Sequence, residues 1–189
     1  MRGKEVEVVK YLLTHKEQNT NVRIISNGLK MDYKLTYGII GRLEKAGIIS
    51  VEKFGHSNNI KLINKISPII FEAEYQRRLE LFKNKDFLVI HNHLSELKLP
   101  FIALLFGSYA KGKQDKHSDI DILVVGGEEK EIGSALSILP DRIHLTHITY
   151  KDFLSMAKSK EFTVVSEAIK NNVILVGIEE YYRLLENAG

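Results

Sequence analysis

The first part of the chain contains three stretches in which apolar residues recur at helical spacing. They cover residues 3–16, 22–28 and 33–46. We expect Asn21 and Asp32 to cap the second and third helices, because short polar side chains accept hydrogen bonds from exposed N–H groups there. Gly28 is expected to stop the second helix. Residues 48–62 then alternate loosely around Gly55, which predicts a β-hairpin.

The pattern changes at Ser67-Pro68, which we take as the boundary between a domain of residues 1–67 and a domain of residues 68–189. Two helices are expected to lead the second domain, followed by short apolar runs of strand length that alternate with further helices. The helices cover residues 69–83 and 86–97, and the strands cover 101–106, 120–125, 142–149 and 173–176. The predicted class is α+β, with a small mixed sheet in the second domain and helices packed on it.

Composition and charge add a division of the chain into a basic and an acidic part. Residues 1–67 contain 12 Lys/Arg and 6 Asp/Glu, whereas residues 68–189 contain 15 and 18. This asymmetry suggests two modules with different partners. The chain has no cysteine, which excludes disulfides, thiolate metal sites and a cysteine nucleophile. We find no apolar run of membrane-spanning length and no signal-peptide pattern, so we expect a cytoplasmic protein without a membrane partner.

Three helices followed by a hairpin is the order of a winged helix-turn-helix domain. The stretch MDYKLTYGIIGRLEKAGIISVE resembles the recognition helix and wing of many prokaryotic transcriptional regulators. By this resemblance the domain would bind double-stranded DNA, and the chain would be a homodimer. The residues expected to meet DNA are Lys30, Lys34, Tyr37, Arg42 and Lys45, with Lys53 and Lys61 on the wing. The alternative is a dimerisation or protein-docking module whose basic side chains are only solvated.

The residues that carry chemistry lie between Phe101 and Val125. Asp119 and Asp121 are two positions apart at the start of a predicted strand, so their carboxylates share one face and can reach a common cation. Gly107 and Ser108 form a turn before a helix start, which suits phosphate binding. Mg²⁺ is commonly held by one or two carboxylates together with substrate phosphates. The alternative for the acidic pair alone is two solvated acids at the start of a strand.

Gly107-Ser108, ten residues, and then Asp119-Ile120-Asp121 resembles the signature of the DNA polymerase β nucleotidyltransferase superfamily. The segments GSYAKG, SDIDILV and EAIKNNVILVG are similar to its minimal, MNT-type branch. The resemblance implies that Asp119 and Asp121 are catalytic and bind Mg²⁺ (or Mn²⁺). It also implies that Gly107, Ser108 and Lys111 bind ATP or another nucleoside triphosphate. The implied reaction transfers a nucleoside monophosphate, AMP being our expectation, to a protein or small-molecule hydroxyl.

One position departs from that family pattern. A third carboxylate belongs on a neighbouring strand, and matching Ile143 and Leu145 to its apolar neighbours puts His144 there instead. Asp141 or one of three glutamates, Glu128, Glu129 and Glu131, could substitute. Without a substitute, a site with two acids would hold one metal, work slowly or only bind nucleotide. In the last case the chain would be a transcriptional regulator whose second domain binds nucleotide without turnover. The resemblance also implies an antitoxin that acts on a HEPN-type protein partner.

Overall fold

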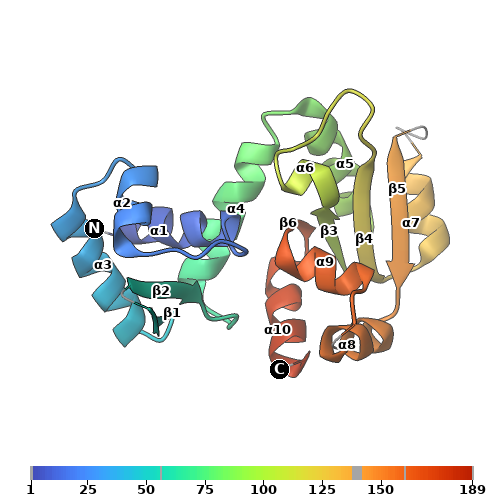
Figure 1. The fold of residues 1–189 in the computed structure, drawn as a ribbon. Helices are drawn as coiled ribbons and strands as arrows, with labels where there is room; N and C mark the ends of the chain where they lie inside the picture. Colours follow the sequence, from blue (N-terminus) through green and yellow to red (C-terminus); the bar gives the residue numbers. More distant parts are fainter. Residues whose placement is uncertain (1, 56, 138–141, 160, 189) are drawn as a thin grey trace. The chain divides into compact units, whose positions relative to one another are not determined.

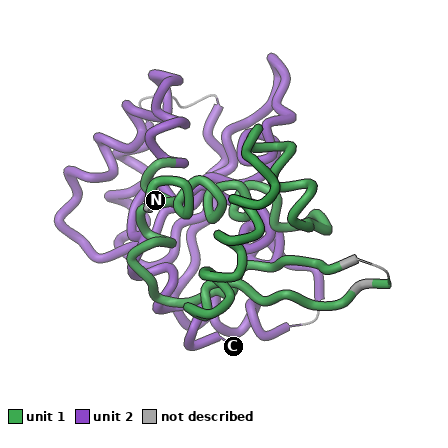
Figure 2. Tube along the Cα trace, turned by 90° about the vertical axis from the view of Figure 1, so that its left-hand side faces the viewer, with its two compact units in different colours: residues 1–76 green, residues 77–189 purple. Residues whose placement is uncertain are grey.

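The computed structural model describes residues 2–55, 57–137, 142–159 and 161–188. The chain divides into two compact units, Met1–Gln76 and Arg77–Gly189 (Figure 2). The boundary predicted after Ser67 lies at the start of helix α4 (Pro68–Leu81), and the division by contacts lies inside that helix. Among the described residues, no helix has the length and apolar character that crossing a membrane requires.

The first unit consists of three helices and a hairpin, followed by the start of α4. The bounds are α1 Arg2–Thr14, α2 Val22–Gly28, α3 Tyr33–Lys45, β1 Ile49–Phe54 and β2 Ser57–Leu62. The two strands pair antiparallel, from Ile49 opposite Leu62 to Phe54 opposite Ser57. Both predicted N-caps are confirmed, because Asn21 Oδ1 accepts from the Ile24 N–H and Asp32 Oδ1 accepts from the Leu35 N–H, each at 2.9 Å.

Helix α2 ends at Gly28 as predicted, but Gly28 does not adopt a left-handed conformation there. Helix α2 ends with Leu29 as its C-cap, and the positive φ of 50° belongs to Lys30. A Cβ on Gly28 would lie 2.8 Å from the Tyr11 hydroxyl oxygen and closer still to the ring. The glycine therefore makes room for a tyrosine of α1 rather than supplying a left-handed turn.

The second unit contains one four-stranded sheet in the order β5-β4-β3-β6. The strands are β3 Phe101–Phe106, β4 Ile120–Gly126, β5 Ile143–Ile148 and β6 Val173–Val176. The helices beyond α4 are α5 Lys85–Glu96, α6 Gly107–Ala110, α7 Glu129–Leu136, α8 Tyr150–Lys158, α9 Val164–Lys170 and α10 Ile178–Ala188. Strand β3 pairs antiparallel with β4 and β6, and β4 pairs parallel with β5, so the predicted mixed sheet is present.

Helices cover both faces of this sheet, with α5 and α7 behind it and α9 in front (Figure 1). Alternate residues of β3 and β4 pack with Phe87 and Ile90 of α5 and with Ile132 of α7. The intervening residues of the strands point to the opposite face. β3 is one of the two inner strands, and all six of its residues are buried.

Candidate functional site

The two predicted aspartates lie at the start of β4. Ile120 and Ile122 belong to the core on the α5 and α7 face, so alternation places Asp121 on the other face. Asp119 directly precedes the strand, two positions from Asp121, and has an exposed side chain. The Asp121 side chain is 26% exposed. Asp119 and Asp121 therefore both lie at the start of β4, where solvent can reach their side chains.

Gly107 brings the turn after β3 into direct contact with Asp121. Phe106, the last residue of β3, pairs with Asp121 across the antiparallel ladder. Gly107 has φ of +68°, and a Cβ there would lie 3.0 Å from Asp121 Cγ and closer still to Oδ2. Only glycine fits both the conformation and the space. The two halves of the predicted motif are thus in contact.

His144 lies beside Asp121 on the neighbouring parallel strand. The register of β4 and β5 pairs these two residues directly. His144 Nδ1 is 3.2 Å from Asp121 Oδ1, and the imidazole is 69% exposed. Ile143 and Leu145 pack toward the core as expected, which leaves His144 on the face of the carboxylates. One oxygen of Asp121 therefore already has a hydrogen-bonding neighbour.

The acids considered as substitutes lie elsewhere or outside the described residues. Glu128, Glu129 and Glu131 are at the start of α7, beyond the far end of β4. Because a strand rises about 3.3 Å per residue, seven residues of β4 separate them from Asp119 by roughly 20 Å. Asp141 lies outside the described residues.

The remaining donor set suits a single hard cation. Within residues 2–55, 57–137, 142–159 and 161–188, no group of three or more His, Asp or Glu side chains could hold a metal ion. Two carboxylates nevertheless match what Mg²⁺ takes from a protein when phosphates complete its shell. The residues at hand therefore fit one divalent cation better than two.

Lys111, predicted to bind phosphate, is held by a residue that the sequence did not indicate. Its N–H donates to Gly107 O at 3.3 Å, so its backbone belongs to the same turn. Its Nζ donates to Glu167 Oε1 of α9 at 3.0 Å. The two side chains are 31% and 30% exposed. Lys111 thus lies at the site, but in an ion pair.

Tyr109 and Arg142 connect the turn to the neighbouring strand, and neither was anticipated. Arg142 donates to the Tyr109 hydroxyl at 2.6 Å, and its carbonyl accepts from the Ile120 N–H, also at 2.6 Å. The Tyr109 ring meets Phe87 of α5 edge to face. These contacts fix α6 against the starts of β4 and β5.

The segment between α6 and β4 is exposed and contains a local turn. Asp115 Oδ1 accepts from the His117 N–H at 2.8 Å and from Ser118 Oγ at 3.0 Å. These hydrogen bonds, that from His117 first, lower the pKa of Asp115. Ser118 therefore shapes the turn that leads to Asp119.

In the first unit, all the residues expected to meet DNA are exposed. They are Lys30, Lys34, Tyr37, Arg42, Lys45, Lys53 and Lys61. Helical spacing puts Lys34, Tyr37 and Lys45 on one face of α3, where Tyr37 is 64% exposed. Arg42 donates to Glu5 at 2.7 Å, and Lys61 donates to Glu52 at 2.9 Å. Lys34, Tyr37 and Lys45 therefore share an exposed face of α3. The charges of Arg42 and Lys61 are partly neutralised by these glutamates.

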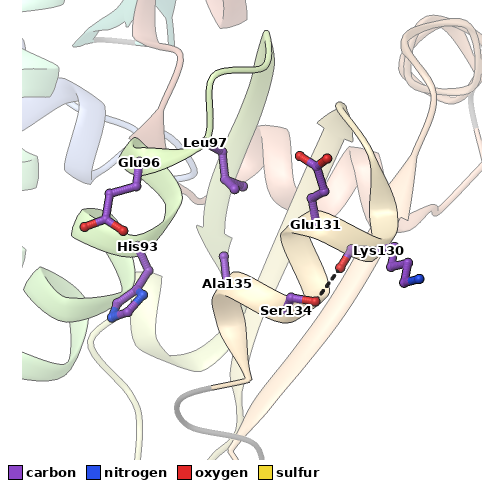
Figure 3. Close-up of a pocket in the computed structure, with 7 residues that line it drawn as sticks. All are labelled: His93, Glu96, Leu97, Lys130, Glu131, Ser134 and Ala135. Carbon is purple, nitrogen blue, oxygen red and sulfur yellow. Dashed lines mark hydrogen bonds between the residues drawn. The ribbon is translucent and has the colours of Figure 1, made fainter.

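A separate hollow of about 630 Å³ lies between α5 and α7 (Figure 3). Its lining residues are His93, Glu96, Leu97, Lys130, Glu131, Ser134 and Ala135. These helices cover the face of the sheet opposite Asp121, so the hollow is not part of the aspartate site. None of the predicted catalytic or nucleotide-binding residues lines it.

Residues 89–181 match the family model described as "Polymerase beta, Nucleotidyltransferase". No match was found among curated proteins or among solved structures. The matched segment contains the Gly107 turn, both aspartates, His144 and Glu167. The match supports a domain of the nucleotidyltransferase superfamily in this part of the chain.

Proposed function

We propose that the second unit binds a Mg²⁺–nucleoside triphosphate and transfers a nucleoside monophosphate, AMP by expectation, to a hydroxyl of a protein or small molecule. The observation that carries this proposal is the contact between Gly107 and Asp121. It joins a turn suited to phosphate with a carboxylate suited to metal, inside a segment that matches a nucleotidyltransferase family model.

Each residue has a role that follows from its chemistry. Gly107 and Ser108 offer backbone N–H groups at the start of α6, where no side chain caps the helix. Lys111 supplies a positive charge beside them. Asp119 and Asp121 would hold the divalent cation, which neutralises phosphate charge when bound. His144, beside Asp121, orients that carboxylate by hydrogen bonding.

Radiolabelled ATP tests the transfer. The protein is incubated with Mg²⁺, labelled ATP and a panel of protein and small-molecule acceptors, and it is compared with Asp119→Ala and Asp121→Ala. We expect label on an acceptor with the natural protein and its loss with either variant. Equal labelling by all three proteins, or none across the panel, would contradict transfer.

A second function is favoured by the pair of His144 and Asp121. With a histidine where a carboxylate would complete the site, the unit would bind nucleotide without turnover, as a sensor or antitoxin-type domain. Calorimetry with ATP and Mg²⁺ separates this function from transfer, since it requires binding without labelling. A HEPN-type protein encoded beside this chain would be the partner to test by co-purification.

We further propose that the first unit is a winged helix-turn-helix that binds double-stranded DNA through α3 and the hairpin, with the chain acting as a homodimer. The excess of basic residues before Ser67 and the exposed face of Lys34, Tyr37 and Lys45 support this role. Mobility shifts on genomic fragments at low salt test it, together with the mass in solution by light scattering. Absence of retardation at low salt would contradict DNA binding.

A further inference from the structure

We propose that Glu167 sets the nucleotide affinity of the site by holding Lys111 in an ion pair that phosphate must break. This inference rests on the proposed nucleotide pocket around Gly107. It gives Glu167 of α9 the role of positioning the Lys111 side chain, which neither the sequence motif nor the family match indicates. The phosphate group of the nucleotide is the competitor for Lys111.

Glu167 is rigidly presented. Its helix buries Val165 and Ala168 completely. At the start of α9, Thr163 Oγ1 accepts from the Ser166 N–H at 3.0 Å in a capping box. At the end, Asn172 Nδ2 donates to Ala168 O at 2.6 Å. Both ends of this short helix are therefore fixed, so the backbone of Glu167 has a defined position from which its carboxylate reaches Lys111.

Lys111 is tied at its backbone to the turn. Its N–H donates to Gly107 O, and the N–H of Lys113, two residues further on, donates to Ser108 O at 3.0 Å. The position of the lysine Cα is thus coupled to the residues proposed to receive phosphate. Its long side chain is the part that can change direction, and it points to Glu167.

Charge puts the two partners of Lys111 in competition. An ammonium group is a compact charge, so a phosphate that takes Lys111 must displace the carboxylate or leave it close by. Glu167 and the phosphates then repel each other, and with both side chains of the pair about 30% exposed, water screens the repulsion only in part. The carboxylate therefore opposes nucleotide binding in two ways.

The test is the affinity for ATP in the presence of Mg²⁺, measured by calorimetry on the full chain. We expect Glu167→Gln to bind ATP about 2- to 5-fold more tightly, the range set by a partly exposed charge pair. Its melting temperature should stay the same or fall slightly. If Glu167 only supported the fold, its replacement would lower both the ATP affinity and the melting temperature. Glu161→Gln, an exposed glutamate before α9, makes the same charge change and should leave the affinity unaltered.

The lysine supplies the second arm. Lys111→Met should weaken ATP binding, and the double variant Lys111→Met/Glu167→Gln should bind no more tightly than the natural protein, because no lysine is released. Equal or weaker binding by Glu167→Gln, or a full gain in the double variant, would overturn the inference. If neither the natural protein nor Glu167→Gln binds ATP, the proposed pocket itself fails, and this inference fails with it.

Discussion

Gly107 is the residue on which the aspartate site depends most directly. Replacing it with alanine forces a side chain into positive φ and against Asp121. We expect Gly107→Ala to destabilise the protein by about 1–3 kcal/mol and to weaken ATP binding about tenfold or more. Urea unfolding and calorimetry measure the two effects.

Gly112→Ala is the matched control for Gly107→Ala. Gly112 also has positive φ, at +63°, but an added Cβ would meet nothing within 4 Å. We expect a strain of about 1 kcal/mol and an unaltered ATP affinity. If the two variants bound ATP equally, the contact between Gly107 and Asp121 would not be part of the pocket.

His144 offers a gain-of-function experiment. Because His144 pairs with Asp121 in register, His144→Asp places two carboxylates side by side, which repel one another until a cation neutralises them. We expect the affinity for Mn²⁺ to rise about tenfold, by calorimetry. His144→Asn keeps a hydrogen-bonding side chain without the charge and should show no gain. Equal Mn²⁺ affinity in all three proteins would show that His144 does not limit the metal site.

Residue-level prediction succeeded where the determining geometry was local. Alternation along β4 was enough to put Asp121 on the face opposite the core, and matching Ile143 and Leu145 to the family pattern was enough to find His144. The pair of Lys111 and Glu167 joins residues 56 positions apart, and it depends on how α9 packs against the sheet. No periodicity near either residue contains that information.

At the scale of elements, the helices and strands were largely predictable because their apolar periods are regular. Gly28 ends α2 as predicted, but for a reason that the local sequence does not contain. Glycine after a helical stretch predicts a left-handed terminus, but here the determining contact is the Tyr11 ring from another helix. The pairing of β4 with β5 in parallel was likewise not available from either strand alone, because it depends on a crossover through α7.

The packing of α5 on β6 predicts a pH dependence of stability. His91 Nδ1 is 3.0 Å from Leu175 O, and its ring lies against Phe82. Burial first, and the charge of Arg78 second, lower the pKa of His91. The unfolded chain therefore takes up the proton at its ordinary pKa of about 6.5, before the folded protein does. The contribution of neutral His91 to the free energy of unfolding is therefore fully present above about pH 6.5, the ordinary pKa, and is lost as the pH falls below it.

Urea unfolding at pH 7.5 and pH 5.5 measures this loss. His91→Gln should reduce the difference between the two conditions. His117→Gln, which changes an exposed histidine, should leave the difference as it is. An identical pH dependence in all three proteins would contradict the assignment to His91.

At the scale of the whole molecule, the excess of basic residues before Ser67 allows a test of the DNA binding proposed for the first unit. If the first unit binds DNA through phosphates, the logarithm of affinity must fall linearly with the logarithm of salt concentration. We expect Lys34→Ala and Lys45→Ala each to reduce that slope by about 1. Fluorescence anisotropy over a salt series measures it. Lys151→Ala, in α8, is the control, and a slope lowered equally by all three changes would contradict a contact surface on α3.

The burial of β3 also means that two segments next to the site should exchange their amide hydrogens with solvent at very different rates. These segments are β3 and residues 111–117. β3 is hydrogen-bonded to a strand on each side and runs directly into Gly107, so its amides should open only with global unfolding. Residues 111–117 are exposed and should exchange within seconds to minutes. Deuterium uptake followed by mass spectrometry would therefore register a bound nucleotide as new protection in residues 111–117 alone. The slowly exchanging amides of β3 would show in the same experiment that the protein is still folded.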